Sequence, residues 1–135
     1  MKPYLTFLSM SIAATLLSAC KKDKIPGSDS LTGTWELSVD VGGWSGVHNH
    51  KPGNDTLVIF TGTSYSFLQK GVLVRSGTYQ VRKDTIYMDH TLGNRIIFDG
   101  QDAGYPHEFF TIRNNQLTLF IDAFDAGSAT YRRIK

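Results

Sequence analysis

The sequence has 135 residues, of which 14 are Lys or Arg and 12 are Asp or Glu. Four of these basic residues and two of the acidic residues precede Leu31, so the rest of the chain carries no net charge. A neutral domain lacks the basic surface that nucleic acid requires, and we expect no nucleic-acid partner. Because Cys20 is the single cysteine, the chain cannot form an internal disulfide and must be stable through its core alone.

The first residues predict an export signal. Lys2 precedes a mostly apolar run from Leu5 to Leu17, and two small residues follow before Cys20. The run is shorter than the roughly 20 residues that a membrane-spanning helix needs. Residues 17–20, Leu-Ser-Ala-Cys, resemble the lipobox of bacterial lipoproteins. The resemblance implies a signal peptide over residues 1–19 and lipidation of Cys20; an ordinary signal peptide with an incidental cysteine is the alternative.

Residues 20–30 are polar, lack a hydrophobic period and contain a Pro-Gly pair, which is typical of a flexible tether. The resemblance to lipoproteins implies that Cys20 carries acyl chains such as palmitate and that the membrane is a partner through them. Lys21 follows the cysteine where enteric inner-membrane lipoproteins have Asp. This favours the outer membrane over the inner membrane within the cell envelope.

From Leu31 onward the apolar residues recur with period two, and no window has the spacing of an amphipathic helix. Turn residues interrupt the pattern in a glycine-rich connection over 41–54, at Lys83 and Asp84, and at the tight turn Asn114-Asn115. Gly77 predicts a bulge or bend within a long strand. The expected strands cover residues 34–40, 57–60, 65–68, 72–82, 85–90, 95–98, 109–113, 117–122 and 128–134.

These eight or nine short antiparallel strands predict one all-β domain over residues 31–135. With no helix to cover them, the strands must close on themselves or divide into two sheets to protect their edges. We favour an antiparallel up-and-down β-barrel of about eight strands, with a β-sandwich as the alternative.

The start and the end of this domain carry a resemblance to a known family. Residues 31–37, Leu-Thr-Gly-Thr-Trp-Glu-Leu, resemble the Gly-x-Trp signature that opens lipocalin and fatty-acid-binding barrels of the calycin type. Residues 130–134 are similar to the closing strand of small bacterial lipocalin-like lipoproteins. The resemblance implies that Gly33 and Trp35 close the barrel floor and that Arg132 or Arg133 lies over the indole. Strand alternation places these arginines on opposite faces and leaves the choice open.

Two departures from the lipocalin pattern bear on the interior. The chain is shorter than a typical lipocalin and has no helix before the last strand, which implies a small interior or none. An eight-stranded barrel is just wide enough to be filled by side chains or to hold one small ligand, and both readings stay open. A pocket would use aromatic side chains and loops at the open end, and the candidates for its lining or mouth are Trp44, Tyr79, Tyr105 and Phe110.

The sequence contains few signs of catalysis. His48 and His50 have a spacing that can chelate a metal, but the sequence fixes no third ligand, and we interpret this segment as a solvated loop. The chain has no Gly-x-Ser-x-Gly motif. We therefore predict no catalytic residue, no metal, no cofactor and no enzymatic activity.

The expected function is that of a membrane-anchored lipocalin-like lipoprotein that binds a small hydrophobic ligand non-covalently. The alternative is a structural or protein-interaction module, in which a filled barrel presents its loops to another envelope protein.

Overall fold

The computed structural model describes residues 30–135, which form nine strands and no helix. Within these residues, no helix is long and apolar enough to cross a membrane. The predicted signal peptide, Cys20 and residues 20–29 of the predicted tether lie outside the described residues, so these assignments stay predictions. The strands are β1 (Gly33–Gly42), β2 (Gly46–Asn49), β3 (Leu57–Phe60), β4 (Ser64–Gln69), β5 (Val72–Thr85), β6 (Leu92–Phe98), β7 (Glu108–Arg113), β8 (Gln116–Ile121) and β9 (Ser128–Arg133).

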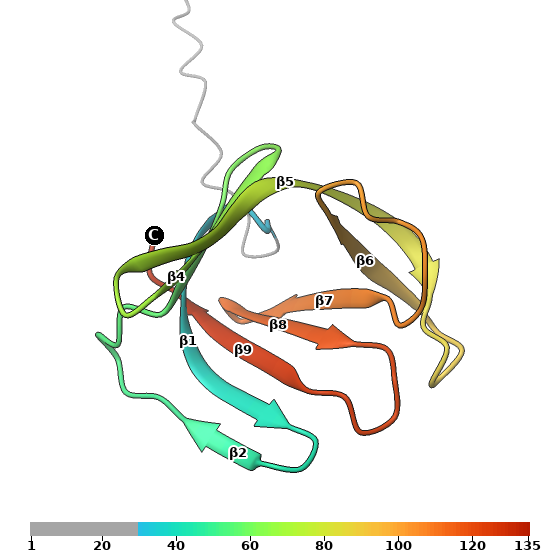
Figure 1. Cartoon of the computed structure of the whole chain (residues 1–135), viewed down its shortest axis with the longest axis horizontal. Helices are drawn as coiled ribbons and strands as arrows, with labels where there is room; N and C mark the ends of the chain where they lie inside the picture. The colour runs from blue at the N-terminus through green and yellow to red at the C-terminus, as the bar shows by residue number, and fades with distance from the viewer. Residues whose placement is uncertain (1–29) are drawn as a thin grey trace, which may run out of the picture.

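The sheet closes into a barrel (Figure 1). β1 and β3 to β9 pair with their neighbours in chain order, every pair is antiparallel, and β9 returns to pair with β1. These eight strands form a closed ring, which leaves no strand at an edge. β2 lies outside the ring, where it pairs with β1 alone and forms an edge of the sheet. The predicted all-β, up-and-down barrel is confirmed, and the β-sandwich is excluded.

One edge of β1 is shared by two strands. Its first half pairs with β3, whereas its second half pairs with β2 from Val39 opposite Asn49 to Gly42 opposite Gly46. The glycine-rich connection predicted over residues 41–54 therefore contains a strand that the sequence did not predict. All four residues of β2 are exposed, so this strand has no buried face and leaves no apolar alternation in the sequence.

The β5–β6 hairpin also differs from the prediction. Lys83 and Asp84 do not turn but pair with β6, and the turn falls after Thr85. His90 adopts a positive φ of 58°, and the Asp89 carboxylate accepts hydrogen bonds from the backbone and hydroxyl of Thr91. A side-chain-supported turn of this kind needs neither Gly nor Pro, so the sequence pattern placed the turn too early. The tight turn predicted at Asn114-Asn115 is confirmed, with φ of 50° and 58°.

Side chains from every strand of the ring fill the inside of the barrel. The Tyr65 ring meets Phe98 edge to face at 4.6 Å, and Phe60 meets Tyr79 in the same way at 5.1 Å. Gly77 lies opposite Tyr65, where a Cβ would come within 1.8 Å of the Asp99 carboxylate. The lack of a side chain at Gly77 therefore lets the Asp99 carboxylate pack against the backbone of β5. The bulge or bend predicted at Gly77 is found instead in the β4–β5 pairing, at Phe67 and Leu68. The buried cluster consists of Leu31, Trp35, Leu37, Val58, Phe60, Tyr65, Ile96, Phe98, Phe110, Leu117, Leu119 and Tyr131.

One end of the barrel is closed around Trp35, which is completely buried. The indole Nε1 donates a hydrogen bond to Leu31 O at 2.9 Å, so the chain entering β1 lies across the ring. The Arg133 guanidinium covers the ring with its Cζ 4.1 Å from the centroid, and it donates to Thr32 O and Ser30 O at 2.9 and 2.5 Å. Arg133 is therefore the arginine that lies over Trp35.

Gly33 and Arg132 have separate roles at this closed end. Gly33 adopts φ of +148°, and a Cβ on it would lie 2.7 Å from Lys135 O, because the last residues of the chain run against the start of β1. Arg132 lies on the outer face, where its Nε donates to Glu36 Oε2 at 2.9 Å. Glu36 is buried beneath the segment that follows β2 and also accepts hydrogen bonds from the backbone of Gly53 and Asn54.

We predict that Arg133→Met lowers the free energy of unfolding by about 2 kcal/mol, because it removes a cation–π contact and two hydrogen bonds to carbonyls. Arg113→Met is the matched control, since Arg113 is exposed in the β7–β8 hairpin, and its effect should stay below about 0.5 kcal/mol. Urea denaturation measures both. Equal effects of the two substitutions would contradict the assigned role of Arg133.

Candidate functional site

The other end of the barrel is open and holds two adjoining cavities. Along the β1–β9 pair, Trp35 lies opposite Arg133 at the closed end and Val41 lies opposite Ser128 at this open end, which we call the mouth. The first cavity has a volume of about 280 Å³, opens to solvent, and has a mainly apolar lining from Val41, Phe67, Glu108, Leu119, Phe120, Ile121, Gly127, Ser128, Ala129 and Tyr131.

The second cavity, of about 310 Å³, lies against β6 and the loop that joins it to β7. Its lining is more polar and includes Arg75, Gln101, Tyr105 and His107. Glu108 lines both cavities, so the polar and the apolar space meet at its side chain.

Glu108 faces the inside of the barrel because of its register. It lies opposite Ile121 of β8 and Ile96 of β6, and it precedes the buried Phe110 by two residues on the same face of β7. The inward-facing residues of β7 are thus apolar deeper in the barrel, and the row ends at the mouth with the carboxyl group of Glu108. Among the described residues, Glu108 has neither a hydrogen-bond donor nor an ion-pair partner.

The environment of Glu108 changes its electrostatics. Burial raises the pKa of Glu108, and the positive charge of Arg75 opposes that rise. Arg75 is itself engaged elsewhere: its Nη2 lies 3.3 Å from Asp99 Oδ2, and its Cζ lies 5.2 and 5.1 Å from the ring centroids of Tyr65 and Phe98. Burial, followed by the negative charges of Glu108 and Asp40, raises the pKa of Tyr131 to about 12. The Tyr131 phenol therefore keeps its proton at neutral pH.

Asp40 and two histidines form a polar cluster on the rim of the mouth. The register of the β1–β9 pair shifts between Leu37 and Val39, which turns Asp40 to the same face as Ala129 and Tyr131. On β2, His48 lies opposite Asp40, and its Nδ1 is 3.2 Å from Asp40 Oδ2. The interpretation of this segment as a solvated loop is thus wrong for His48, which lies on a strand.

The second histidine completes the cluster, because His50 Nε2 shares a hydrogen bond with Asp40 Oδ1. The hydrogen bond to His50 is the main cause that lowers the pKa of Asp40. Burial acts in the opposite direction, and the hydrogen bond to His48 lowers the pKa further. Across residues 30–135, no group of three or more His, Cys, Asp or Glu is arranged to hold a metal ion. The cluster ties the β1–β2 hairpin together beside the mouth.

The four aromatic residues expected at a pocket lie in different places. Tyr105 lines the second cavity, and Phe110 is buried in the core near the first. Tyr79 packs against the core and its hydroxyl donates to Thr61 O at 2.6 Å. Trp44 lies in the β1–β2 turn, is 98% exposed and lines neither cavity.

The residues that sequence reasoning missed are Glu108, Leu119, Ala129 and Tyr131. Their alternation along β7, β8 and β9 was visible, but which face of each strand is inward depends on the pairing between strands. The signal that could have found Glu108 is its place two residues before Phe110 in the same alternating row.

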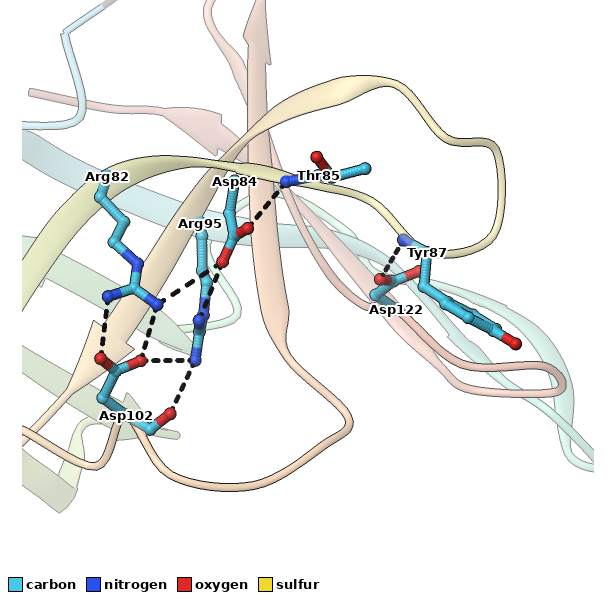
Figure 2. A network of polar contacts seen from close by, with 7 residues as sticks. All are labelled: Arg82, Asp84, Thr85, Tyr87, Arg95, Asp102 and Asp122. Carbon is cyan, nitrogen blue, oxygen red and sulfur yellow. Dashed lines mark hydrogen bonds and ion pairs between the residues drawn. The ribbon is translucent and has the colours of Figure 1, made fainter.

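A network of four charged side chains holds the loop beside the second cavity (Figure 2). The buried Arg95 donates from Nη1 to Asp84 Oδ2 at 2.9 Å and from Nη2 to the backbone oxygen of Asp102 at 3.0 Å. Arg82 binds the Asp102 carboxylate with both terminal nitrogens, at 2.8 and 2.9 Å. This loop is therefore fixed to β5 and β6 through charge-assisted hydrogen bonds.

Asp122 fixes the β5–β6 turn in a similar way (Figure 2). It is buried, and its carboxylate accepts hydrogen bonds from the backbone nitrogens of Tyr87 and Met88 at 2.6 and 3.1 Å. The turn thus lies against the β8–β9 loop on the outer side of the barrel.

Comparisons of this chain with protein-family models, with curated proteins and with solved structures found no match.

We predict that Asp84→Asn lowers stability at neutral pH and has little effect in acid. The hydrogen bond from Arg95 is the main cause that lowers the pKa of Asp84 below its ordinary 3.8. A carboxylate whose pKa is lowered by folding stabilises the fold above its ordinary pKa, and this contribution is lost as the pH falls through the folded-state value. Urea denaturation should therefore show the difference from the unsubstituted chain shrinking below pH 3.8.

The control for this experiment is Asp55→Asn. Asp55 is exposed and has a positive φ of 55°, which Asn also tolerates, so this substitution should change stability little at either pH. A stability difference for Asp84→Asn that stays constant with pH would contradict the assigned ion pair.

Proposed function

We propose that this protein is a lipid-anchored, lipocalin-like lipoprotein of the cell envelope that binds a small apolar molecule at the barrel mouth without chemistry. The observation that supports the binding function is the mainly apolar cavity of about 280 Å³ between Phe67, Leu119, Ala129 and Tyr131. Its volume is close to the lower limit of small-molecule sites, about 300 Å³. Burying an apolar ligand there would gain about 25 cal/mol for each Å² removed from water.

The filled floor of the barrel limits the ligand to a compact shape. Phe110, Leu117 and Tyr65 belong to the same buried cluster as Trp35, so side chains fill the interior of the barrel and leave little room for a long acyl chain. We therefore favour a ligand of one or two rings or a short branched chain over a fatty acid.

The described part of the chain begins at the closed end of the barrel, opposite the mouth. The backbone oxygen of Ser30 accepts a hydrogen bond from Arg133 at the closed end, so a tether over residues 20–30 would enter there. The lipobox-like residues 17–20, with Lys21 after the cysteine, support a place at the outer membrane more than at the inner membrane. The mouth would then face away from the membrane that holds the anchor.

A second candidate function is an interaction with another envelope protein. Trp44 and Phe124 are 98% and 75% exposed, and the turns that carry them touch, since a Cβ on Gly43 would meet the backbone oxygen of Asp125. Two exposed aromatic side chains on adjoining turns are typical of a binding surface. Crosslinking from position 44 in whole cells would produce a partner band only for this second function.

We predict that Ala129→Phe abolishes ligand binding, because the added ring fills the first cavity. Binding is measured by fluorescence titration of the mature chain, from residue 20 with Cys20→Ser, with the neutral two-ring probe 6-propionyl-2-(dimethylamino)naphthalene. The unsubstituted chain should bind the probe, and Ala129→Phe should weaken binding by at least about tenfold, a loss of about 1.4 kcal/mol.

Thr111→Phe is the matched control, since it adds the same ring at an exposed position of β7 and should leave probe binding intact. Near-UV circular dichroism checks that both variants keep their packed core. An Ala129→Phe variant that is folded and binds the probe as well as the unsubstituted chain would contradict the proposed site.

A further inference from the structure

The charge that remains uncompensated at the cavity is negative. Glu108 is the one acidic side chain that lines either cavity, and within residues 30–135 it has no ion-pair partner. Glu108 is half-buried, and even partial burial of a carboxylate without a partner costs free energy, because charges removed from water are normally paired. A bound ligand with a positive charge would supply the missing partner.

Both arginines that line the second cavity are already engaged within the protein, Arg95 with Asp84 and Asp102. The guanidinium of Arg75 is paired with Asp99 and lies against the rings of Tyr65 and Phe98. The carboxylate of Asp99 also accepts hydrogen bonds from the Tyr65 hydroxyl at 2.7 Å and from the Thr78 backbone at 3.1 Å. Releasing Arg75 for an anionic ligand would break this network, so the mouth is poorly built to bind a carboxylate.

A second acidic group adds to the negative potential. Asp40 turns toward the same face as Ala129, and its charge and that of Glu108 both act on the Tyr131 hydroxyl. Tyr131 lines the first cavity beside Glu108 and presents a neutral hydroxyl there. The polar side chains that line the apolar cavity are those of Glu108, Ser128 and Tyr131, and Glu108 is the one among them that can carry a negative charge at neutral pH.

This inference rests on the proposed function and names the class of its ligand. We infer that the ligand is an amine, with a cationic nitrogen bound by the Glu108 carboxylate and a compact apolar body that fills the cavity between Phe67, Leu119 and Ala129. The nitrogen donates a charge-assisted hydrogen bond to the carboxylate, and the apolar body is removed from water. A carboxylic acid of the same shape would place a second negative charge beside Glu108.

The test compares three probes of one shape with different charge: 1-naphthylmethylamine, 1-naphthalenemethanol and 1-naphthoic acid. Isothermal titration of the mature chain with Cys20→Ser should give the amine an affinity at least about tenfold above that of the alcohol, and the acid the weakest affinity. Glu108→Gln keeps the shape of the side chain and should reduce the amine to the level of the alcohol. The Glu108→Gln variant should bind the alcohol with the same affinity as the unsubstituted chain. This result would show that the cavity is intact in the variant.

Asp55→Asn removes the same charge from an exposed position that lines neither cavity, and should leave all three affinities unchanged. Equal binding of amine and alcohol to the unsubstituted chain would overturn the inference and leave the proposed function standing. Binding of none of the three probes would overturn both. The comparison of probes on the unsubstituted chain does not depend on any variant folding.

Discussion

Closure of the sheet by the pairing of β9 with β1 determines the rest of this structure. The pair begins with Trp35 opposite Arg133 and ends with Val41 opposite Ser128, so the two strands that close the ring also define its two ends. At the first end, the indole, the guanidinium and the carbonyls of the incoming chain form a compact seal. Near the other end, one register shift turns Asp40 inward and places a charge on the rim.

The barrel is divided along its length into a filled floor and an open mouth. Aromatic rings and aliphatic side chains fill the floor, whereas at the mouth the small side chain of Ala129 leaves a cavity that Phe67, Leu119, Tyr131 and Glu108 also line. The loops at the mouth are fixed by carboxylates: Asp102 and Asp84 through the two arginines, and Asp40 through the two histidines. Glu108 is the carboxylate at the mouth that performs no such structural task, which is why the proposed ligand class depends on it.

The parts of the fold that could be predicted are those where one face of a strand is buried. Alternation around Trp35 and Leu37 placed β1, and Asn114 with Asn115 marked a turn through residues that tolerate positive φ. β2 is exposed on all its residues and leaves no such pattern. The inward direction of Glu108 and the choice between Arg132 and Arg133 depend on which residue each one pairs with across the sheet. That information is absent from any single strand.

The central claim is that the mouth of this barrel holds a small ligand. We expect native mass spectrometry of the full-length protein purified from its own cells, beside the Ala129→Phe variant purified in parallel, to decide this. We expect a low-mass adduct on the unsubstituted protein and its absence from the variant. Identical masses for the two proteins, after allowance for the substitution, with no adduct on either, would contradict it.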